Sequence, residues 1–169
     1  APLISASGLG VSFQRPKKLF MKRPPAFEAV RPLALTLAPG ETLGIVGESG
    51  SGKTTLALAL LRLTQSRGEI AFGDTRLDTL TGAALRRMRQ RFQIVFQDPF
   101  GSLSPRLPVS EIVSEGLRFH HPELSPDEVA RRVAATLTEV GLPEDCADRY
   151  PHEFSGGQRQ RIAVARAII

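Results

Sequence analysis

Eight consecutive residues have the types and the spacing needed to hold a chain of phosphates. They are Gly47-Glu48-Ser49-Gly50-Ser51-Gly52-Lys53-Thr54, and they fit the pattern G-x-x-x-x-G-K-[ST]. Glycines let successive backbone N–H groups turn toward phosphate oxygens, because no Cβ blocks the approach. Lys53 adds a positive charge for the outer phosphates, and the Thr54 hydroxyl can bind Mg²⁺. The pattern predicts a nucleoside triphosphate site, in which we include the next residue, Thr55.

A strand before this loop and a helix after it must hold the loop in place. The apolar run 41–46 predicts a buried strand, and residues 55–61 predict a helix. The positive end of that helix adds a fixed partial charge where the phosphates are expected. This strand, loop and helix context favours a true phosphate loop over a glycine-rich turn without a ligand.

A second segment, near the end of the chain, can also hold an anion. Phe154-Ser155-Gly156-Gly157-Gln158 runs directly into a helical pattern at 159–167. A serine and two glycines at a helix start offer a hydroxyl, unobstructed N–H groups and the positive end of the helix dipole. One nucleotide has one phosphate chain, so two cradles favour a head-to-tail dimer in which each copy covers the other's nucleotide. The alternative is an ordinary capped helix.

A glutamine and an aspartate follow another expected strand, at 92–96. Asp98 after an apolar run imitates the Mg²⁺-binding acidic strand of phosphate-loop enzymes. However, no glutamate follows it, and Pro99 and Gly101 turn the backbone away at once. These features count against Asp98, which stays the alternative; the catalytic role of Gln97 is implied by the family resemblance given below.

Hydrophobic spacing and turn residues predict the remaining elements. Ser125 is expected to cap a helix, Glu128 to complete a capping box, and Gly141 to end that helix. The proline-rich basic run 14–25 predicts a solvated loop, with a membrane or phosphate contact as the alternative. Strands are expected at 3–13, 33–37 and 68–73, a loop at 100–108, and helices at 83–91, 109–119 and 126–140.

Length and composition indicate one soluble globular domain. The chain has 169 residues, and no apolar run in it approaches the roughly 20 residues that cross a bilayer. We therefore expect a cytoplasmic location and no membrane span. The single cysteine, Cys146, excludes an intrachain disulfide, and the histidines lack the spacing of metal ligands. The net charge of +5 comes from scattered basic residues. We expect no nucleic-acid partner. The alternative is that the arginine-rich helix at 83–91 binds a nucleic-acid phosphate backbone.

Taken together, these motifs resemble the nucleotide-binding subunit of an ATP-binding cassette (ABC) transporter over the whole chain. Residues 47–54 resemble the Walker A loop, Gln97 the Q-loop glutamine, and 154–158 the LSGGQ signature, with phenylalanine replacing leucine. The resemblance implies an α/β fold, a P-loop NTPase of ABC type. Its parts are an N-terminal antiparallel β region, a RecA-like core and a helical subdomain. The resemblance also implies that Gln97 reaches Mg²⁺ and the attacking water. Phe13 is implied to stack on adenine, or else to be an ordinary strand-end residue.

Longer runs, at 47–50, 97–106 and 150–161, resemble the oligopeptide and dipeptide importers. The likeness is greatest to the second cassette of a fused ATPase for microcin-type peptide uptake. It implies that ATP hydrolysis energises peptide import on the inner face of the cell membrane, with a second cassette and membrane-spanning permease subunits as partners. Permease contacts are implied near Phe100, Ser102 and Leu103. A soluble ABC-type ATPase acting on DNA, an exporter cassette and a P-loop kinase or GTPase are the alternatives.

Several family features that follow the signature helix are not in these 169 residues. They are an apolar strand ending in Asp-Glu, a loop that crosses the dimer and a switch histidine. We therefore expect one partial domain. It comprises a β region and ATP-binding core (1–97), a Q-loop and helical subdomain (98–158) and the start of a helix returning to the core (159–169). With Lys53 and Gln97 as catalytic residues but no general base, we expect weak ATP binding and no turnover.

Overall fold

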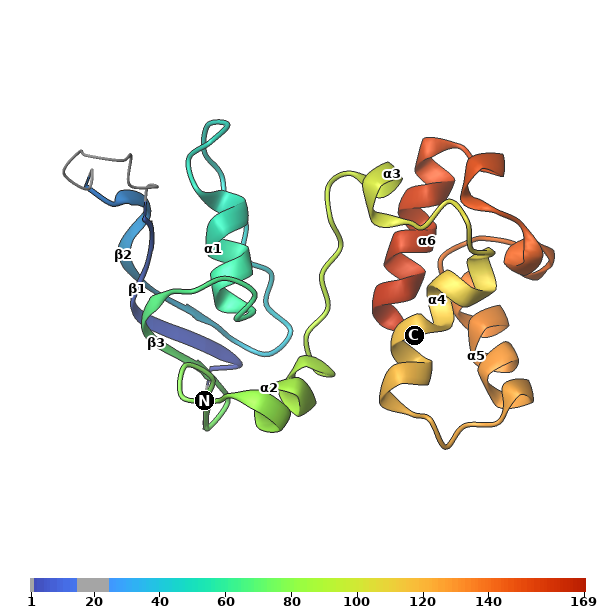
Figure 1. Ribbon diagram of the computed structural model, residues 1–169, viewed down its shortest axis with the longest axis horizontal. Helices are drawn as coiled ribbons and strands as arrows, with labels where there is room; N and C mark the ends of the chain where they lie inside the picture. The colour runs from blue at the N-terminus through green and yellow to red at the C-terminus, as the bar shows by residue number, and fades with distance from the viewer. Residues whose placement is uncertain (1, 15–24) are drawn as a thin grey trace, which may run out of the picture. The chain divides into compact units, whose positions relative to one another are not determined.

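The computed structural model describes residues 2–14 and 25–169, and it divides into two compact units (Figure 1). The first unit is Ala1–Arg89 and carries a β-sheet, and the second is Gln90–Ile169 and is helical. Residues 15–24 of the predicted basic loop lie outside the described residues.

The sheet of the first unit is the antiparallel β region that the sequence predicts. Its strands are β1 (Ile4–Phe13), β2 (Phe27–Leu37), β3 (Arg67–Phe72) and β4 (Thr75–Arg76), in the order β2-β1-β3-β4. The β1–β2 register pairs Ile4 with Leu37 at one end and Phe13 with Phe27 at the other. β2 therefore begins well before the predicted position 33, because its first residues pair with the last residues of β1.

The core of the first unit lies between this sheet and helix α1 (Lys53–Leu60). Leu9, Val11 and Ile70 of the sheet are at most 1% exposed, and Leu56 and Ala59 of α1 are also buried. Burial of each such aliphatic side chain stabilises the fold by about 1.5–3 kcal/mol. This packing fixes the helix that follows the phosphate loop. Helix α2 (Gly82–Arg89) completes the unit.

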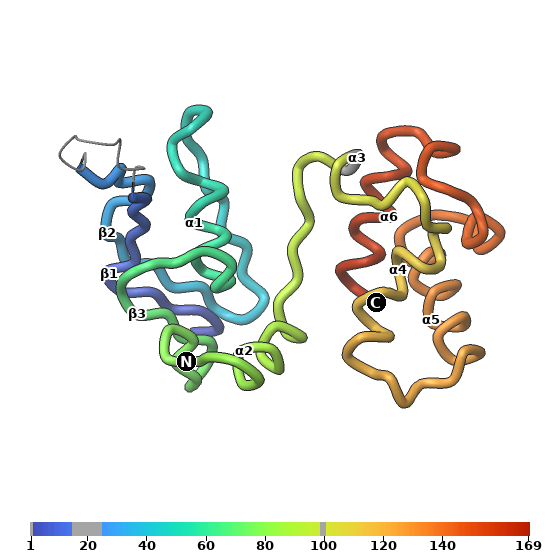
Figure 2. Tube along the Cα trace, in the orientation of Figure 1, coloured from blue at the N-terminus to red at the C-terminus, as the bar shows by residue number. Residues whose placement is uncertain are grey.

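Two predicted strands are not formed, and those predictions were wrong. Residues 41–46 and 92–96 have no regular secondary structure, and Figure 2 traces both runs without helical turns. The side chains are correspondingly open: Val46 is 93% exposed and Phe96 is 43% exposed. A parallel strand needs at least one neighbouring parallel strand to pair its backbone hydrogen-bonding groups. Within the described residues the sheet contains only antiparallel pairs, so neither run has such a neighbour.

The second unit is a helical bundle with short turns between its helices (Figure 1). The predicted loop at 100–108 was wrong in its first part, because a short helix, α3, begins at Pro99. Ser125 caps α5 as predicted, with its Oγ accepting from Glu128 N at 3.3 Å, but only this half of the capping box is present. The helices and turns are α3 (Pro99–Ser102), α4 (Val109–His120), α5 (Pro126–Glu139), η1 (Glu144–Asp148), η2 (Pro151–Glu153) and α6 (Gly156–Ile168).

One apolar core joins α4, α5 and α6. Ile112, Leu137 and Ile162 lie in it and are at most 2% exposed, and Cys146 is fully buried among them. Desolvation raises the pKa of the Cys146 thiol, so it carries less thiolate than a free cysteine at the same pH. Phe154 also packs into this core, which anchors the start of α6.

Across residues 2–14 and 25–169, no helix combines the length and apolar character that crossing a membrane requires.

Candidate functional site

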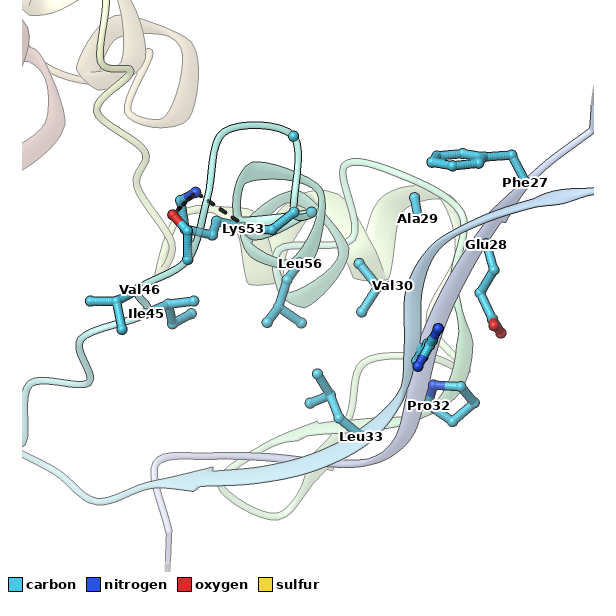
Figure 3. Close-up of a pocket in the computed structure, with 15 residues that line it drawn as sticks. Phe27, Glu28, Ala29, Val30, Pro32, Leu33, Ile45, Val46, Lys53 and Leu56 are labelled. Carbon is cyan, nitrogen blue, oxygen red and sulfur yellow. Dashed lines mark hydrogen bonds between the residues drawn. The ribbon is translucent and has the colours of Figure 1, made fainter.

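The phosphate loop leads directly into α1, and Lys53 is the first residue of that helix. Its ammonium Nζ donates to the backbone oxygens of Gly47 at 2.8 Å and Glu48 at 2.7 Å, and lies 3.5 Å from Ser51 Oγ. The loop is therefore wrapped around the lysine ammonium, as Figure 3 shows. This places the single positive charge of residues 47–54 inside the cradle and beside the N-terminal end of α1, where an anion is favoured.

Two glycines of the loop occupy positions where a side chain has no room. Gly52 has φ +95°, and a Cβ there would lie 2.4 Å from the backbone oxygen of Ala29 on β2. A Cβ on Gly47 would lie 2.7 Å from Ser51 Oγ. The first contact packs the loop against the sheet, and the second keeps the loop tightly closed. The spacing of glycines in the sequence predicted the cradle, but it did not predict the contact with β2.

A cavity of about 550 Å³ adjoins the loop, between β2 and α1 (Figure 3). Val30 and Leu33 of β2 and Leu56 of α1 point into it, and Lys53 lies at its edge. Its lining combines apolar side chains with the polar loop and two charged side chains of β2, Glu28 and Arg31. Ile45 and Val46 also border it, in the run that was predicted to form a buried strand.

Two aromatic residues lie at one end of the sheet near this cavity. Phe13, the residue assigned to adenine, is the last residue of β1 and is 45% exposed. Its register partner Phe27 is 49% exposed and lines the cavity. No sequence pattern marks Phe27, because it follows the proline-rich basic run and precedes the predicted start of its strand. The part of the site that β2 contributes, including Phe27 and Ala29, was not predicted from the sequence.

The second predicted cradle forms the N-terminal end of α6. Ser155 is the N-cap: its Oγ accepts from Gln158 N at 3.3 Å, and Gln158 Oε1 accepts from Ser155 N at 2.9 Å. This reciprocal capping box fixes the first turn of the helix. Ser155, Gly156 and Gly157 are exposed, whereas Phe154 just before them is buried. Within the described residues, no hydrogen bond is found for the N–H groups of the two glycines. They face solvent with the helix dipole behind them.

The capping role of Ser155 gives a direct test of stability. Ser155→Ala is expected to lower the free energy of unfolding by about 1 kcal/mol, because an N-cap hydroxyl contributes about that much. Ser125→Ala is the matched comparison, because its Oγ makes the same 3.3 Å bond at the start of α5. Urea unfolding of the three proteins measures both effects. An unchanged midpoint for Ser155→Ala beside a lowered one for Ser125→Ala would show that the α6 capping box is not formed.

The residues assigned to Mg²⁺ chemistry and to permease contacts differ in their exposure. Gln97 is exposed at a bend in the irregular run before α3. Leu103 is only 3% exposed and belongs to the core of the second unit. The predicted permease contact of Leu103 was therefore wrong. The side chain of Phe100 lies outside what the structure describes. Within the described residues, no group of three or more His, Cys, Asp or Glu is placed to hold a metal ion.

The turn before the second cradle is held by ionic and hydrogen-bonding contacts. Glu153 Oε2 accepts from Tyr150 N at 2.6 Å, and Glu153 Oε1 lies 3.4 Å from Arg149 Nε. The Tyr150 N–H and then the Arg149 charge lower the pKa of the Glu153 carboxyl below its usual value. Glu153 is therefore ionised at neutral pH and keeps both contacts.

Comparison with curated proteins finds close relatives among transport ATPases. One is the peptidoglycan transport ATP-binding protein YejF of Agrobacterium fabrum, 56% identical over 142 residues, which are 84% of this chain and 26% of that protein. Another is the oligopeptide transport ATP-binding protein OppF of Haemophilus influenzae, 45% identical over 99% of this chain and 51% of that protein. The chain thus spans about a quarter to a half of the length of these relatives.

Comparison with solved structures confirms the fold. The dimeric ATP-binding cassette MJ0796, in a post-hydrolysis state bound to ADP and phosphate, matches with a TM-score of 0.81. The two are 28% identical, and the match covers 98% of this chain and 68% of that one. The predicted ABC-type fold with its N-terminal antiparallel sheet is therefore confirmed. The sequence model of the ABC transporter family matches residues 30–169. The chain belongs to the ABC transporter family.

Proposed function

We propose that this chain binds Mg²⁺-ATP between two copies of the cassette, and that closing and opening of this pair energises import of peptides or peptide-like compounds. The observation that carries the proposal is the signature turn at 155–158, exposed at residues 155–157, which accompanies a complete phosphate loop in one chain. The phosphate loop and the signature turn each supply half of an anion site. The peptidoglycan and oligopeptide transport roles that give YejF and OppF their names support the choice of peptide-like cargo.

The residues of the phosphate loop fit the phosphate chain of a nucleoside triphosphate. The ammonium of Lys53 already lies inside the loop on backbone oxygens, and a phosphate offers it stronger, charged acceptors. Loop N–H groups and the start of α1 add donors and partial positive charge around the same oxygens. Thr54 is exposed in the first turn of α1, where its hydroxyl is suited to Mg²⁺. The bound Mg²⁺ would neutralise charge on the outer phosphates.

The signature turn of one copy would cover the nucleotide held by the other. Its hydroxyl, its exposed glycine N–H groups and the dipole of α6 make it complementary to the terminal phosphate. ATP then bridges the phosphate loop of one copy and the signature turn of the other, and without ATP we expect the two copies to associate weakly. Loss of that phosphate on hydrolysis removes the shared ligand and favours separation. Gln97 is assigned to the Mg²⁺ and attacking water, and Phe13 to the adenine ring.

Partners and location follow from this assignment. We infer that the cassette acts on the cytoplasmic side of the membrane with permease subunits, and that a second cassette, identical or fused, completes the sites. The division into an ATP-binding core (1–97), a helical subdomain (98–158) and a returning helix (159–169) stays a prediction. So does the expectation that these residues alone do not sustain ATP hydrolysis.

ATP-driven self-association tests the proposal. Sedimentation of the chain with Mg²⁺-ATP is expected to show dimers, and Ser155→Arg is expected to abolish them by blocking the turn with a large cation. Ser125→Arg is the matched control, since it removes an equivalent N-cap on α5, and it should still dimerise. Dimers of equal strength with Ser155→Arg, or no ATP-dependent dimers of the unaltered chain, would refute the two-copy site.

A further inference from the structure

Three consecutive backbone oxygens just before the signature turn each receive a hydrogen bond from an arginine. Arg159 Nε donates to Pro151 O at 2.7 Å, and its Nη2 lies 3.4 Å from His152 O. Arg149 Nη2 donates to Glu153 O at 3.1 Å. These oxygens belong to η2, the 3-10 turn that brings the chain to Phe154 and Ser155.

The two arginines approach this turn from opposite directions in the sequence. Arg149 precedes the turn and also lies over the Phe154 ring, with its guanidinium carbon 4.6 Å from the ring centroid. Arg159 lies on α6, one helical turn after Ser155, and reaches back across the N-cap. Its bond to Pro151 is part-buried, so water competes less for that donor. The direction in which the chain enters α6 is therefore fixed from both sides.

This arrangement constrains the residues that form the cradle. Phe154 is 5% exposed, and its N–H donates to Pro151 O, the oxygen that Arg159 also contacts. With the turn and the Phe154 ring both held, Ser155 follows at a defined position for its capping box. α5 shows that capping does not need such a device. Ser125 caps α5, and among the described residues no arginine donates to the backbone oxygens of residues 121–124 just before it.

We propose that Arg159, assisted by Arg149, is a positioning residue that holds the turn at 151–153 so that the anion cradle at 155–158 is preformed. The inference rests on the proposed function, because a cradle has a use only if an anion binds there. A preformed cradle costs less ordering entropy when the nucleotide of the other copy arrives. Arg159 then acts on the affinity between copies and not on the first binding of ATP at Lys53.

Amide hydrogen exchange of the whole chain, without nucleotide, tests the positioning role. Arg159→Met is expected to speed exchange of the Phe154, Ser155 and Gln158 amides by about tenfold or more, because their local structure opens more readily. Amides in the core of α5, such as those of Val133 and Leu137, should keep their rates. Arg159→Lys keeps the charge but cannot reach two oxygens with a planar fork, so a smaller acceleration at the same amides is expected.

Arg161→Met is the matched control. Arg161 is also on α6 and its Nη1 donates to a backbone oxygen, that of Gly141 at 3.0 Å, which lies beyond the end of α5 and not in the turn. Its loss should leave the signature amides unchanged. Wild-type exchange at 154–158 in Arg159→Met, or equal acceleration throughout α5, overturns the proposal. If Arg159→Met does not fold, Arg159→Lys takes its place: wild-type exchange at 154–158, or equal acceleration throughout α5, in that variant overturns the proposal.

A nucleotide readout separates this inference from the proposed function. In Arg159→Lys, the ATP concentration needed for half-maximal self-association should rise several-fold, whereas ATP binding by a single copy stays unchanged. A change in single-copy binding instead would contradict the assigned role. The exchange experiment needs no nucleotide, so it tests the turn even if ATP-driven dimers are never observed.

Discussion

Lys53→Ala is expected to weaken ATP binding by the chain about 100-fold. The ammonium is the only side-chain cation in the phosphate loop, and each charge-assisted bond to a phosphate is worth roughly 1.5–3 kcal/mol. A loss of about 2.7 kcal/mol corresponds to that factor. Titration with a fluorescent ATP analogue measures it, and circular dichroism checks that the loop change leaves the helices intact.

Arg131→Ala is the control for this substitution. It removes the same single charge, but from the exposed face of α5, where Arg131 forms no hydrogen bond or ion pair with the described residues. Its ATP affinity should equal that of the unaltered chain. If Lys53→Ala bound ATP within about twofold of Arg131→Ala, the loop at 47–54 would not be the phosphate site.

Gly52→Ala is expected to destabilise the first unit by about 3 kcal/mol and to abolish ATP binding. Backbone with φ +95° costs an L-residue roughly 1–2 kcal/mol. The new Cβ would also lie 2.4 Å from Ala29 O, a backbone atom that can move only with β2. Urea unfolding followed through the amide signals of β1 measures the stability of this unit separately from the helical one.

Gly50→Ala separates the strain from the clash. Gly50 has φ +80°, similar to Gly52, but a Cβ there meets nothing within 4 Å. It should therefore show only the conformational part of the cost, about 1–2 kcal/mol. Equal destabilisation by the two substitutions would mean that the contact between the phosphate loop and β2 contributes nothing.

The strands β1 and β3, the longer helices and both cradles were predictable because their causes are local, whereas the antiparallel pairing of the strands was implied by the family resemblance. Alternating apolar residues specify β1 and β3, and Ser125 and Ser155 mark the starts of α5 and α6 through bonds within four residues. The phosphate loop follows from glycine and lysine spacing alone. In each case the residues that fix the geometry are neighbours in the sequence.

The errors concern segments whose structure depends on distant partners. The runs 41–46 and 92–96 have the composition of buried strands, but a parallel strand forms only beside another one. Phe27 was missed because its place in β2 is set by pairing with Phe13, across the basic run. The family resemblance implied a permease contact for Leu103, whereas packing against the helical core buries it. Sequence patterns alone do not reveal such long-range contacts.

The central claim, that two copies share each nucleotide, is tested most directly by cross-linking. A copy with Ser49→Cys in its exposed phosphate loop is mixed with a copy with Gly157→Cys, a position where a Cβ meets nothing within 4 Å. The native Cys146 is buried and gives little background. A short thiol cross-linker is expected to join the two copies when Mg²⁺-ATP is present. In the control mixture both copies also carry Lys53→Ala, and no cross-link is expected. Binding of ATP without any cross-link between copies would contradict the account.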